Sequence, residues 1–121
     1  MAKIPFALRE AVSKYVQTLH IDGIHVRQVF LYGSHARNQV HEDSDIDLII
    51  VSEDFAGKNL LDRLRLLGWA QRDVHDPLEA YGFTPEEVKK RDMSAFWEEM
   101  LETEAIDITN ELEISESAQV V

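Results

Sequence analysis

The stretch from Phe30 to Val51 constrains the fold more than any other part of the chain. It begins with apolar and aromatic residues that are typical of a buried strand, and Gly33 and Ser34 end that strand. After a polar segment, acidic and apolar residues alternate from Asp45 onwards. Because both faces of this second segment continue into apolar residues, it predicts a strand that is central in its sheet and covered on both sides.

Asp45 and Asp47 lie two positions apart in this second strand, so their side chains point to the same face, about 6.6 Å apart along the chain. Two carboxylates about 4 Å apart repel by roughly 4 kcal/mol at an effective dielectric constant of about 20. A fold tolerates that repulsion when a cation lies between them. Mg²⁺ takes carboxylate oxygens and keeps positions for phosphate oxygens. The pair therefore predicts a site for one or two Mg²⁺ ions.

The turn before the aspartates has the features of a phosphate-binding turn. Gly33 has no side chain, so its backbone can come close to a ligand. Ser34 adds a hydroxyl group, and a helical turn after it would present free N–H groups to an anion. One half of the stretch therefore suits a phosphate, and the other half suits the metal ion that accompanies it.

The same residues carry a resemblance to a known family. Gly33 and Ser34, ten residues, Asp45, one residue and Asp47 match the G-S-x10-D-x-D signature of the polymerase-beta-like nucleotidyltransferases. The wider string GSHARNQVHEDSDIDLIIV resembles the minimal nucleotidyltransferases (MNT), small prokaryotic proteins often paired with a HEPN-type ribonuclease toxin. An S-D-I-D-L string alone is often a loop leading into a strand, but the glycine and serine at the set distance argue against that interpretation.

The resemblance implies an α/β fold with a small mixed sheet and helices packed mainly on one face. It implies Mg²⁺-dependent transfer of a nucleoside monophosphate, AMP from ATP, to a hydroxyl, with a tyrosine of a HEPN-type toxin as the expected acceptor. Asp45 and Asp47 would be the catalytic metal ligands, and Gly33 and Ser34 would hold the β- and γ-phosphates. The chain would then act as an antitoxin, in a homodimer or in a hetero-oligomer with the toxin.

The family places a third carboxylate on the strand beside the D-x-D strand, a few residues before a helix start. By that count it is Glu79, in a predicted strand from Leu78 to Phe83, although the family more often has aspartate there. The rival is Asp76, which we expect in a loop because Pro77 follows it. The alternative role for Glu79 is a solvent-facing residue on an edge strand.

Two further residues are weaker candidates for nucleotide binding. Arg37 would lie near the phosphates, where the family often has a basic residue, or would pair with Glu42 or Asp43. Ser44 would contact a phosphate or cap the loop before Asp45.

The remaining pattern alternates helices and strands, as in an α/β domain. We expect a helix from Ile4 to His20 and a crossover helix from Leu60 to about Arg72, capped by Asn59. The apolar side of that crossover helix would be formed by Leu60, Leu61, Leu64, Leu67 and Trp69. A capping box from Thr84 to Glu87, a helix from Ser94 to about Glu104 and a short strand from Ala105 to Thr109 complete a domain over residues 1–109. Residues 110–121 are expected to form an acidic, flexible tail.

Composition excludes several other classes of protein. A chain of 121 residues fits one domain, and the absence of cysteine excludes a disulfide framework and thiolate zinc sites. A net charge of -11 argues against nucleic-acid binding through a general basic surface. No apolar run predicts a signal peptide or a membrane span, so a cytoplasmic protein is expected.

Two functions other than toxin modification stay open. The chain could neutralise a toxin by contact without catalysis, because an acidic surface suits a basic RNA-binding site. It could also be a small-molecule nucleotidyltransferase, although the chain lacks the added helical domain with which such enzymes hold their acceptor.

Overall fold

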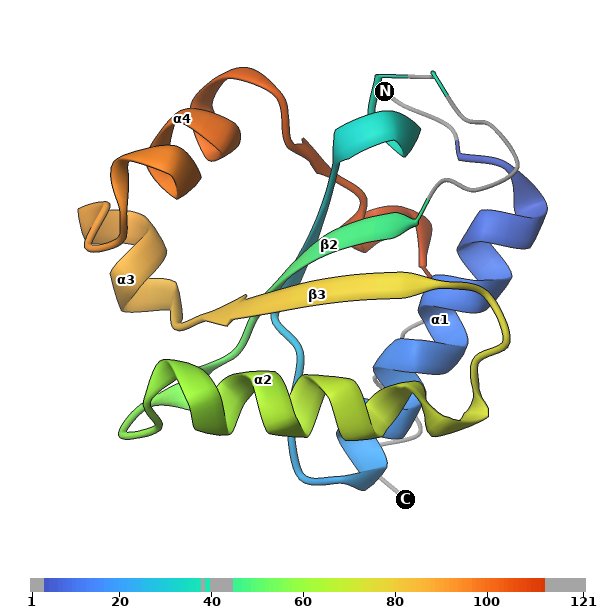
Figure 1. Cartoon of the computed structure of the whole chain (residues 1–121), viewed down its shortest axis with the longest axis horizontal. Coiled ribbons are helices and arrows are strands. Elements are labelled where there is room, and N and C mark those ends of the chain that lie inside the picture. Colours follow the sequence, from blue (N-terminus) through green and yellow to red (C-terminus); the bar gives the residue numbers. More distant parts are fainter. Residues whose placement is uncertain (1–3, 38, 40–44, 113–121) are drawn as a thin grey trace.

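The computed structural model describes residues 4–37, 39 and 45–112, and these form a four-stranded sheet in the order β3-β2-β1-β4 (Figure 1). The strands are β1 (Gln28–Tyr32), β2 (Ile46–Val51), β3 (Leu78–Phe83) and β4 (Ile106–Asp107). β2 runs antiparallel to β1 and parallel to β3. The sheet is therefore mixed, and the strand that carries Asp47 lies inside it, as the sequence predicts.

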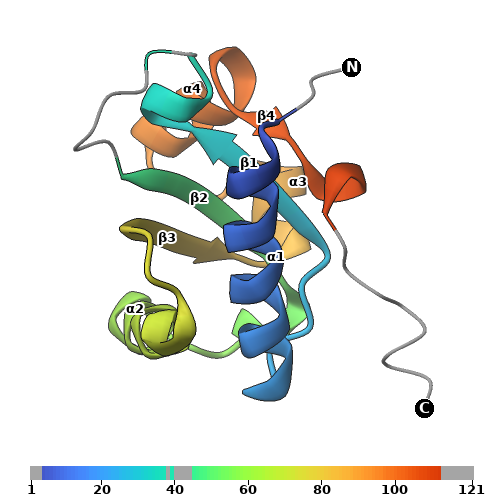
Figure 2. The ribbon, with the colours of Figure 1, turned by 90° about the vertical axis from the view of Figure 1, so that its right-hand side faces the viewer.

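Helices cover both faces of the sheet, but unequally. The two longest, α1 (Phe6–Ile21) and α2 (Leu60–Trp69), pack against the face that forms the larger hydrophobic core. The shorter α3 (Pro85–Lys90) and α4 (Ala95–Thr103) lie over the opposite face, on which a smaller cluster includes Ile49, Val51 and Trp97. Figure 2 shows α1 in front of the sheet and α3 behind it. The predicted packing mainly on one face is confirmed, and the second face keeps part of its surface free for a site.

The predicted helix caps are present. The Asn59 side chain accepts a hydrogen bond from the backbone N–H of Asp62 at 2.8 Å, which starts α2. Thr84 and Glu87 form both bonds of a capping box, at 2.8 Å and 3.1 Å, and start α3 directly after β3. These local bonds fix the points at which each chain segment leaves the sheet.

The predicted apolar side of α2 is only partly buried. Leu67 is buried, but Leu60, Leu61 and Trp69 are 62%, 54% and 64% exposed. The prediction was wrong for these three residues because α2 packs against β3, the outer strand, and meets the sheet along one narrow side. Periodicity shows which residues could face a core, but not how wide the contact is.

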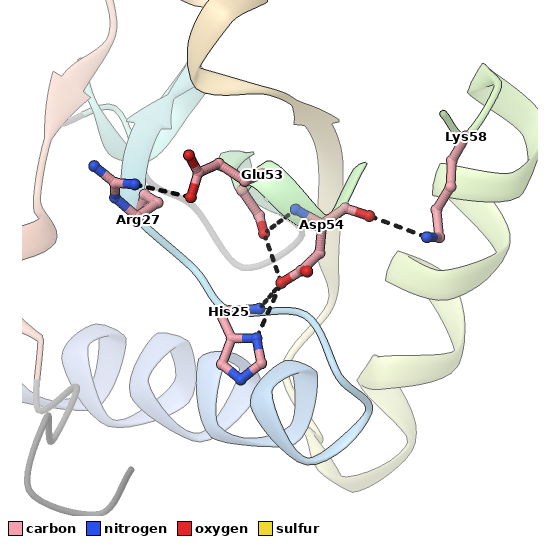
Figure 3. Close-up of polar contacts among 6 residues, drawn as sticks. His25, Arg27, Glu53, Asp54 and Lys58 are labelled. Atoms are coloured by element: carbon pink, nitrogen blue, oxygen red, sulfur yellow. Dashed lines mark hydrogen bonds and ion pairs between the residues drawn. The ribbon is translucent and has the colours of Figure 1, made fainter. Parts of the chain in front are cut away.

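A polar cluster closes the end of the sheet where β1 begins and β2 finishes (Figure 3). The Asp54 carboxylate accepts bonds from the His25 backbone N–H at 2.8 Å and from His25 Nδ1 at 3.0 Å. Lys58 donates to the Asp54 carbonyl at 3.0 Å, and Arg27 pairs with Glu53 at 3.0 Å. The cluster ties the segment after β2 to the segment before β1, far along the strands from Asp47.

Packing of the described chain continues to its last residues. Leu112 is buried in the main core, and Glu111 Oε1 accepts a hydrogen bond from the backbone N–H of Ile4 at 3.0 Å. The rest of the predicted tail, residues 113–121, lies outside the described residues. Within residues 4–37, 39 and 45–112, none of the helices is both long enough and apolar enough to span a membrane.

Candidate active site

Three side chains form a row across the sheet. Tyr32 of β1 pairs in register with Asp47 of β2, and Asp47 pairs with Glu79 of β3. Residues paired across neighbouring strands project from the same face. Asp47 therefore lies between a tyrosine and a second carboxylate, on the face that α3 and α4 cover only in part.

Gly33 brings the turn after β1 directly against this row. Its φ of 73° lies in the left-handed region, which favours glycine. A Cβ atom at residue 33 would overlap the Asp47 carboxylate. The Gly33 carbonyl accepts bonds from the N–H groups of Ala36 and Arg37, both at 3.1 Å, in a short 3-10 turn that holds Ser34 half-buried. The predicted phosphate-binding turn and the predicted metal strand are thus in contact.

Asp45 lies just before β2 and is exposed. His35 Nδ1 is 3.0 Å from the Asp45 carbonyl oxygen, which ties the turn after β1 to the start of β2. Burial raises the pKa of Asp47, and the negative charges of Glu79 and Asp45 raise it further, against the opposing effect of His35 and Arg37. Asp47 is therefore close enough to Glu79 and to Asp45 for the charge of each to act on it.

The oxygen-rich character of this site suits Mg²⁺, which proteins usually hold with one or two carboxylates while substrate phosphates and water complete the shell. A cation would relieve the repulsion that raises the pKa of Asp47. In the described part of the chain, no three Asp, Glu, His or Cys side chains gather tightly enough to form a complete metal site. The residues fit a metal ion that arrives with a nucleotide better than one held by protein alone.

Arg37 and Gly33 share an acidic partner that sequence reasoning missed. The guanidinium of Arg37 is 3.0 Å from Glu104 Oε1, and the Gly33 backbone N–H donates to Glu104 Oε2 at 3.0 Å. Glu104 caps the end of α4 and comes from a segment 71 positions away from Gly33. The alternative partners predicted for Arg37, Glu42 and Asp43, and the predicted binding residue Ser44, lie outside the described residues.

Asp76, the rival third carboxylate, is exposed in the connection before β3. It lines an open cavity of about 600 Å³ together with residues of α1, including Phe6 and Lys14. Glu79, in contrast, pairs with Asp47 in the sheet. Of these two candidates for the third carboxylate, Glu79 is the one that lies in the row with Asp47.

An aromatic group borders the row, and it too was missed. The Trp97 ring of α4 lies 4.7 Å from the ring of Tyr81 and 5.4 Å from that of Tyr32, measured between centroids. Burial raises the pKa of Tyr32, and the charges of Asp47 and Glu79 raise it further. Both tyrosines were expected only as strand residues, because the helix that brings Trp97 to them is distant in sequence.

Two solved structures resemble this fold. One is a candidate nucleotidyltransferase from Sulfolobus solfataricus, with a TM-score of 0.60 and 16% identity, over 84% of this chain and 79% of that one. The other is a toxin-antitoxin structure with AMP-PNP, with a TM-score of 0.54 and 18% identity, over 79% of this chain and 71% of that one. At these identities the likeness shows the fold. A comparison with curated proteins found no match.

The family assignment comes from the sequence of the whole domain. The nucleotidyltransferase domain family matches residues 8–118, a range that includes the turn at Gly33, the D-x-D strand and β3. Because this match covers most of the chain, the chain belongs to the nucleotidyltransferase domain family.

Proposed function

We propose that the chain is an antitoxin that transfers AMP from ATP to a tyrosine of a HEPN-type partner toxin. The observation that carries the proposal is the meeting of Gly33, Asp47 and Glu79 at one point on the sheet. Membership of the nucleotidyltransferase domain family supports nucleotidyl transfer. The likeness to a toxin-antitoxin structure with AMP-PNP supports the toxin partner and the adenine nucleotide.

Each residue has a defined task in this proposal. The Gly33 N–H group and the Ser34 hydroxyl bind oxygens of the β- and γ-phosphates, with Arg37 nearby as a cation, and Ser44 is a further proposed phosphate contact. Asp45 and Asp47, together with Glu79, would hold one or two Mg²⁺ ions. Bound Mg²⁺ would supply positive charge for the oxygens of the phosphoryl group during transfer.

In the proposed reaction, the bond that forms is matched by a bond that breaks, and the chain has a group that can accept the proton. The acceptor oxygen forms a bond to the α-phosphorus while the bond to the α–β bridging oxygen breaks, and pyrophosphate leaves with that electron pair. The hydroxyl proton passes to the Glu79 carboxylate, which is exposed at the site and can reach an incoming acceptor. The family's in-line displacement thus needs no covalent enzyme intermediate.

The first test removes both aspartates of the D-x-D strand. An Asp45→Asn/Asp47→Asn double variant should lose nucleotide transfer and Mg²⁺-dependent ATP binding while keeping its fold. The matched control is Asp62→Asn/Asp92→Asn, which removes the same charge from two exposed positions. The mass of a co-expressed HEPN-type toxin, with and without ATP and Mg²⁺, reports transfer; full modification by the first variant would rule out the proposed site.

Neutralisation by contact alone is the second candidate. It is favoured by the net charge of -11, because an acidic surface suits a basic RNA-binding site on a toxin. A growth-rescue assay with the toxin gene separates the two functions. Rescue by the Asp45/Asp47 double variant equal to wild type supports neutralisation by contact, whereas binding without rescue supports the enzyme.

A further inference from the structure

Glu104 occupies the part of the site where a phosphate is expected. Its two carboxylate oxygens accept hydrogen bonds from the Gly33 backbone N–H and from the Arg37 guanidinium, each at 3.0 Å. These two donors are also those that the proposed function assigns to the nucleotide. A carboxylate and a phosphate share the features that such donors recognise, a negative charge and oxygen acceptors. The donors form an anion site that the chain fills with its own side chain.

We infer that Glu104 is an internal competitor of the nucleotide: its carboxylate holds the anion site of Gly33 and Arg37 until a phosphate group displaces it. The inference rests on the proposed function for the identity of the ligand. It adds a residue that sets nucleotide affinity without touching the reacting atoms.

The surroundings of Glu104 allow such an exchange. Its side chain is 22% exposed and that of Arg37 is 46% exposed, so solvent and ligands reach the pair. An ion pair at this exposure contributes little net free energy, so a triphosphate with more charge can replace the carboxylate. The residue also belongs to the end of α4, whose backbone N–H at Glu104 bonds to the Met100 carbonyl. The displaced side chain can therefore turn outward without unfolding the helix.

The site lies beside the predicted metal ligands. Gly33, whose N–H binds Glu104, is the residue whose backbone contacts the Asp47 carboxylate. An anion held at Gly33 would therefore sit next to a metal ion at Asp47. In the free protein, the Glu104 carboxylate adds negative charge at this point and opposes the entry of a nucleotide without Mg²⁺.

The test compares Glu104→Ala and Glu104→Gln with wild type. Calorimetry of the full chain with Mg²⁺-ATP measures the dissociation constant. Removal of the competitor should tighten binding by about three- to tenfold in the alanine variant, with glutamine between alanine and wild type. If Glu104 instead positions the turn, the order is reversed: alanine binds most weakly and glutamine partly restores affinity. That reversed order, or equal affinity in all three proteins, would overturn the inference.

Glu102→Gln is the matched control for charge. Glu102 lies on the same helix, is 58% exposed and pairs with Arg91 at 3.5 Å, away from Gly33. Its substitution should leave the dissociation constant within about twofold of wild type, since exposed charges are screened by salt. Equal tightening by the Glu102 and Glu104 variants would overturn the inference in favour of a general charge effect.

A second probe separates this inference from the proposed function. Inorganic pyrophosphate carries the phosphate groups without a base or a transferable nucleotide. The amide resonance of Gly33, followed by NMR, should shift at lower pyrophosphate concentration in Glu104→Ala than in wild type. If that shift occurs while no transfer is found, the anion site stands and the proposed function fails. If transfer occurs but the resonance responds equally in both proteins, the proposed function stands and the competitor role fails.

Discussion

The backbone of Gly33 packs so closely against the Asp47 carboxylate that no other residue fits at position 33 without displacing it. The turn that would receive the phosphates and the strand that would hold the metal are therefore a single packed unit. A substitution at either residue should therefore displace the other from its position.

The first prediction uses two glycines with similar backbone conformation. Gly33→Ala places a methyl group on the Asp47 carboxylate, whereas Gly57, with a φ of 79°, has nothing within 4 Å of an added Cβ. Gly57→Ala should cost about 1 kcal/mol of unfolding free energy from backbone strain alone. Gly33→Ala should cost roughly 2–4 kcal/mol, because overpacking adds to the strain, and should abolish ATP binding. Urea denaturation and calorimetry measure both, and equal losses in the two variants would contradict the packing argument.

The second prediction separates the two candidate third carboxylates. Glu79→Gln should reduce nucleotide transfer by about 10²-fold or more, because Glu79 pairs with Asp47 in the sheet. Asp76→Asn should change it less than about threefold, because Asp76 lines the cavity beside α1. Initial rates of pyrophosphate release give the comparison. The reverse ranking would show that the loop before Pro77, and not β3, supplies the catalytic carboxylate.

The third prediction concerns pH and Asp47. The pKa of Asp47 is raised in the folded protein, mainly by burial and then by Glu79 and Asp45, so the ionised form costs stability above that pKa. Asp47→Asn should therefore be at least as stable as wild type at pH 7. The difference should shrink as the pH falls through the folded pKa of Asp47 towards its ordinary value. Thermal unfolding in the absence of divalent cations follows this change.

The fourth prediction concerns Asp54, whose pKa is lowered in the folded protein, whereas that of Asp47 is raised. The backbone hydrogen bond from His25 lowers its pKa the most, with further lowering by the His25 side chain and Ser52. Its stabilising effect is therefore present above the ordinary aspartate pKa and is lost as the pH falls through the lowered one. Asp54→Asn should destabilise the protein by about 1 kcal/mol at pH 7. A gain of stability in this variant would contradict the role of the cluster in Figure 3.

The fifth prediction concerns Arg63, which joins α2 to the start of α3. Its guanidinium bonds to both Glu87 oxygens, at 2.7 Å and 3.1 Å, and to the Gly82 carbonyl at 3.1 Å, with only 11% of the side chain exposed. Arg63→Ala should cost roughly 2–4 kcal/mol, because the half-buried Glu87 loses its charged partner and keeps only the Thr84 N–H, and the Gly82 carbonyl loses a donor. The control Arg65→Ala breaks an exposed pair with Asp62 and should cost less than about 0.5 kcal/mol. Chemical denaturation of both variants tests the difference.

The features that could be predicted from the sequence are those that residues close together in the chain determine. The capping box at Thr84, the cap at Asn59 and the bounds of β3 follow from residues within a few positions of one another. The pairing of Glu79 with Asp47 could be expected only by adding the family's topology to the alternation of the strand. The contact of Glu104 with Gly33 and the exposure of Leu60 could not be predicted, because both depend on where distant elements pack. No local pattern distinguishes Glu104 from the other acidic residues of α4.

The partner of Arg37 is another contact that could not be predicted from the sequence. Its predicted alternatives were a phosphate or an acidic residue nearby in sequence, and the described structure gives it Glu104, from the far end of the chain. The predicted acidic partners, Glu42 and Asp43, lie outside the described residues, and the fold brings Glu104 to Arg37 instead. The proposed roles of Ser34 and Arg37 stay predictions.

The position of β3 at the border of the sheet has a consequence for the kind of acceptor. Among the described residues, β1 and β2 have a neighbouring strand on each side, whereas β3, which carries Glu79, has a neighbouring strand on one side only. In the proposed reaction, a bulky acceptor would approach Glu79 along the outer side of β3 and would need no channel deep enough to enclose it. An architecture of this kind admits a side chain that is still attached to a folded protein, whereas a small free acceptor would find few walls to hold it.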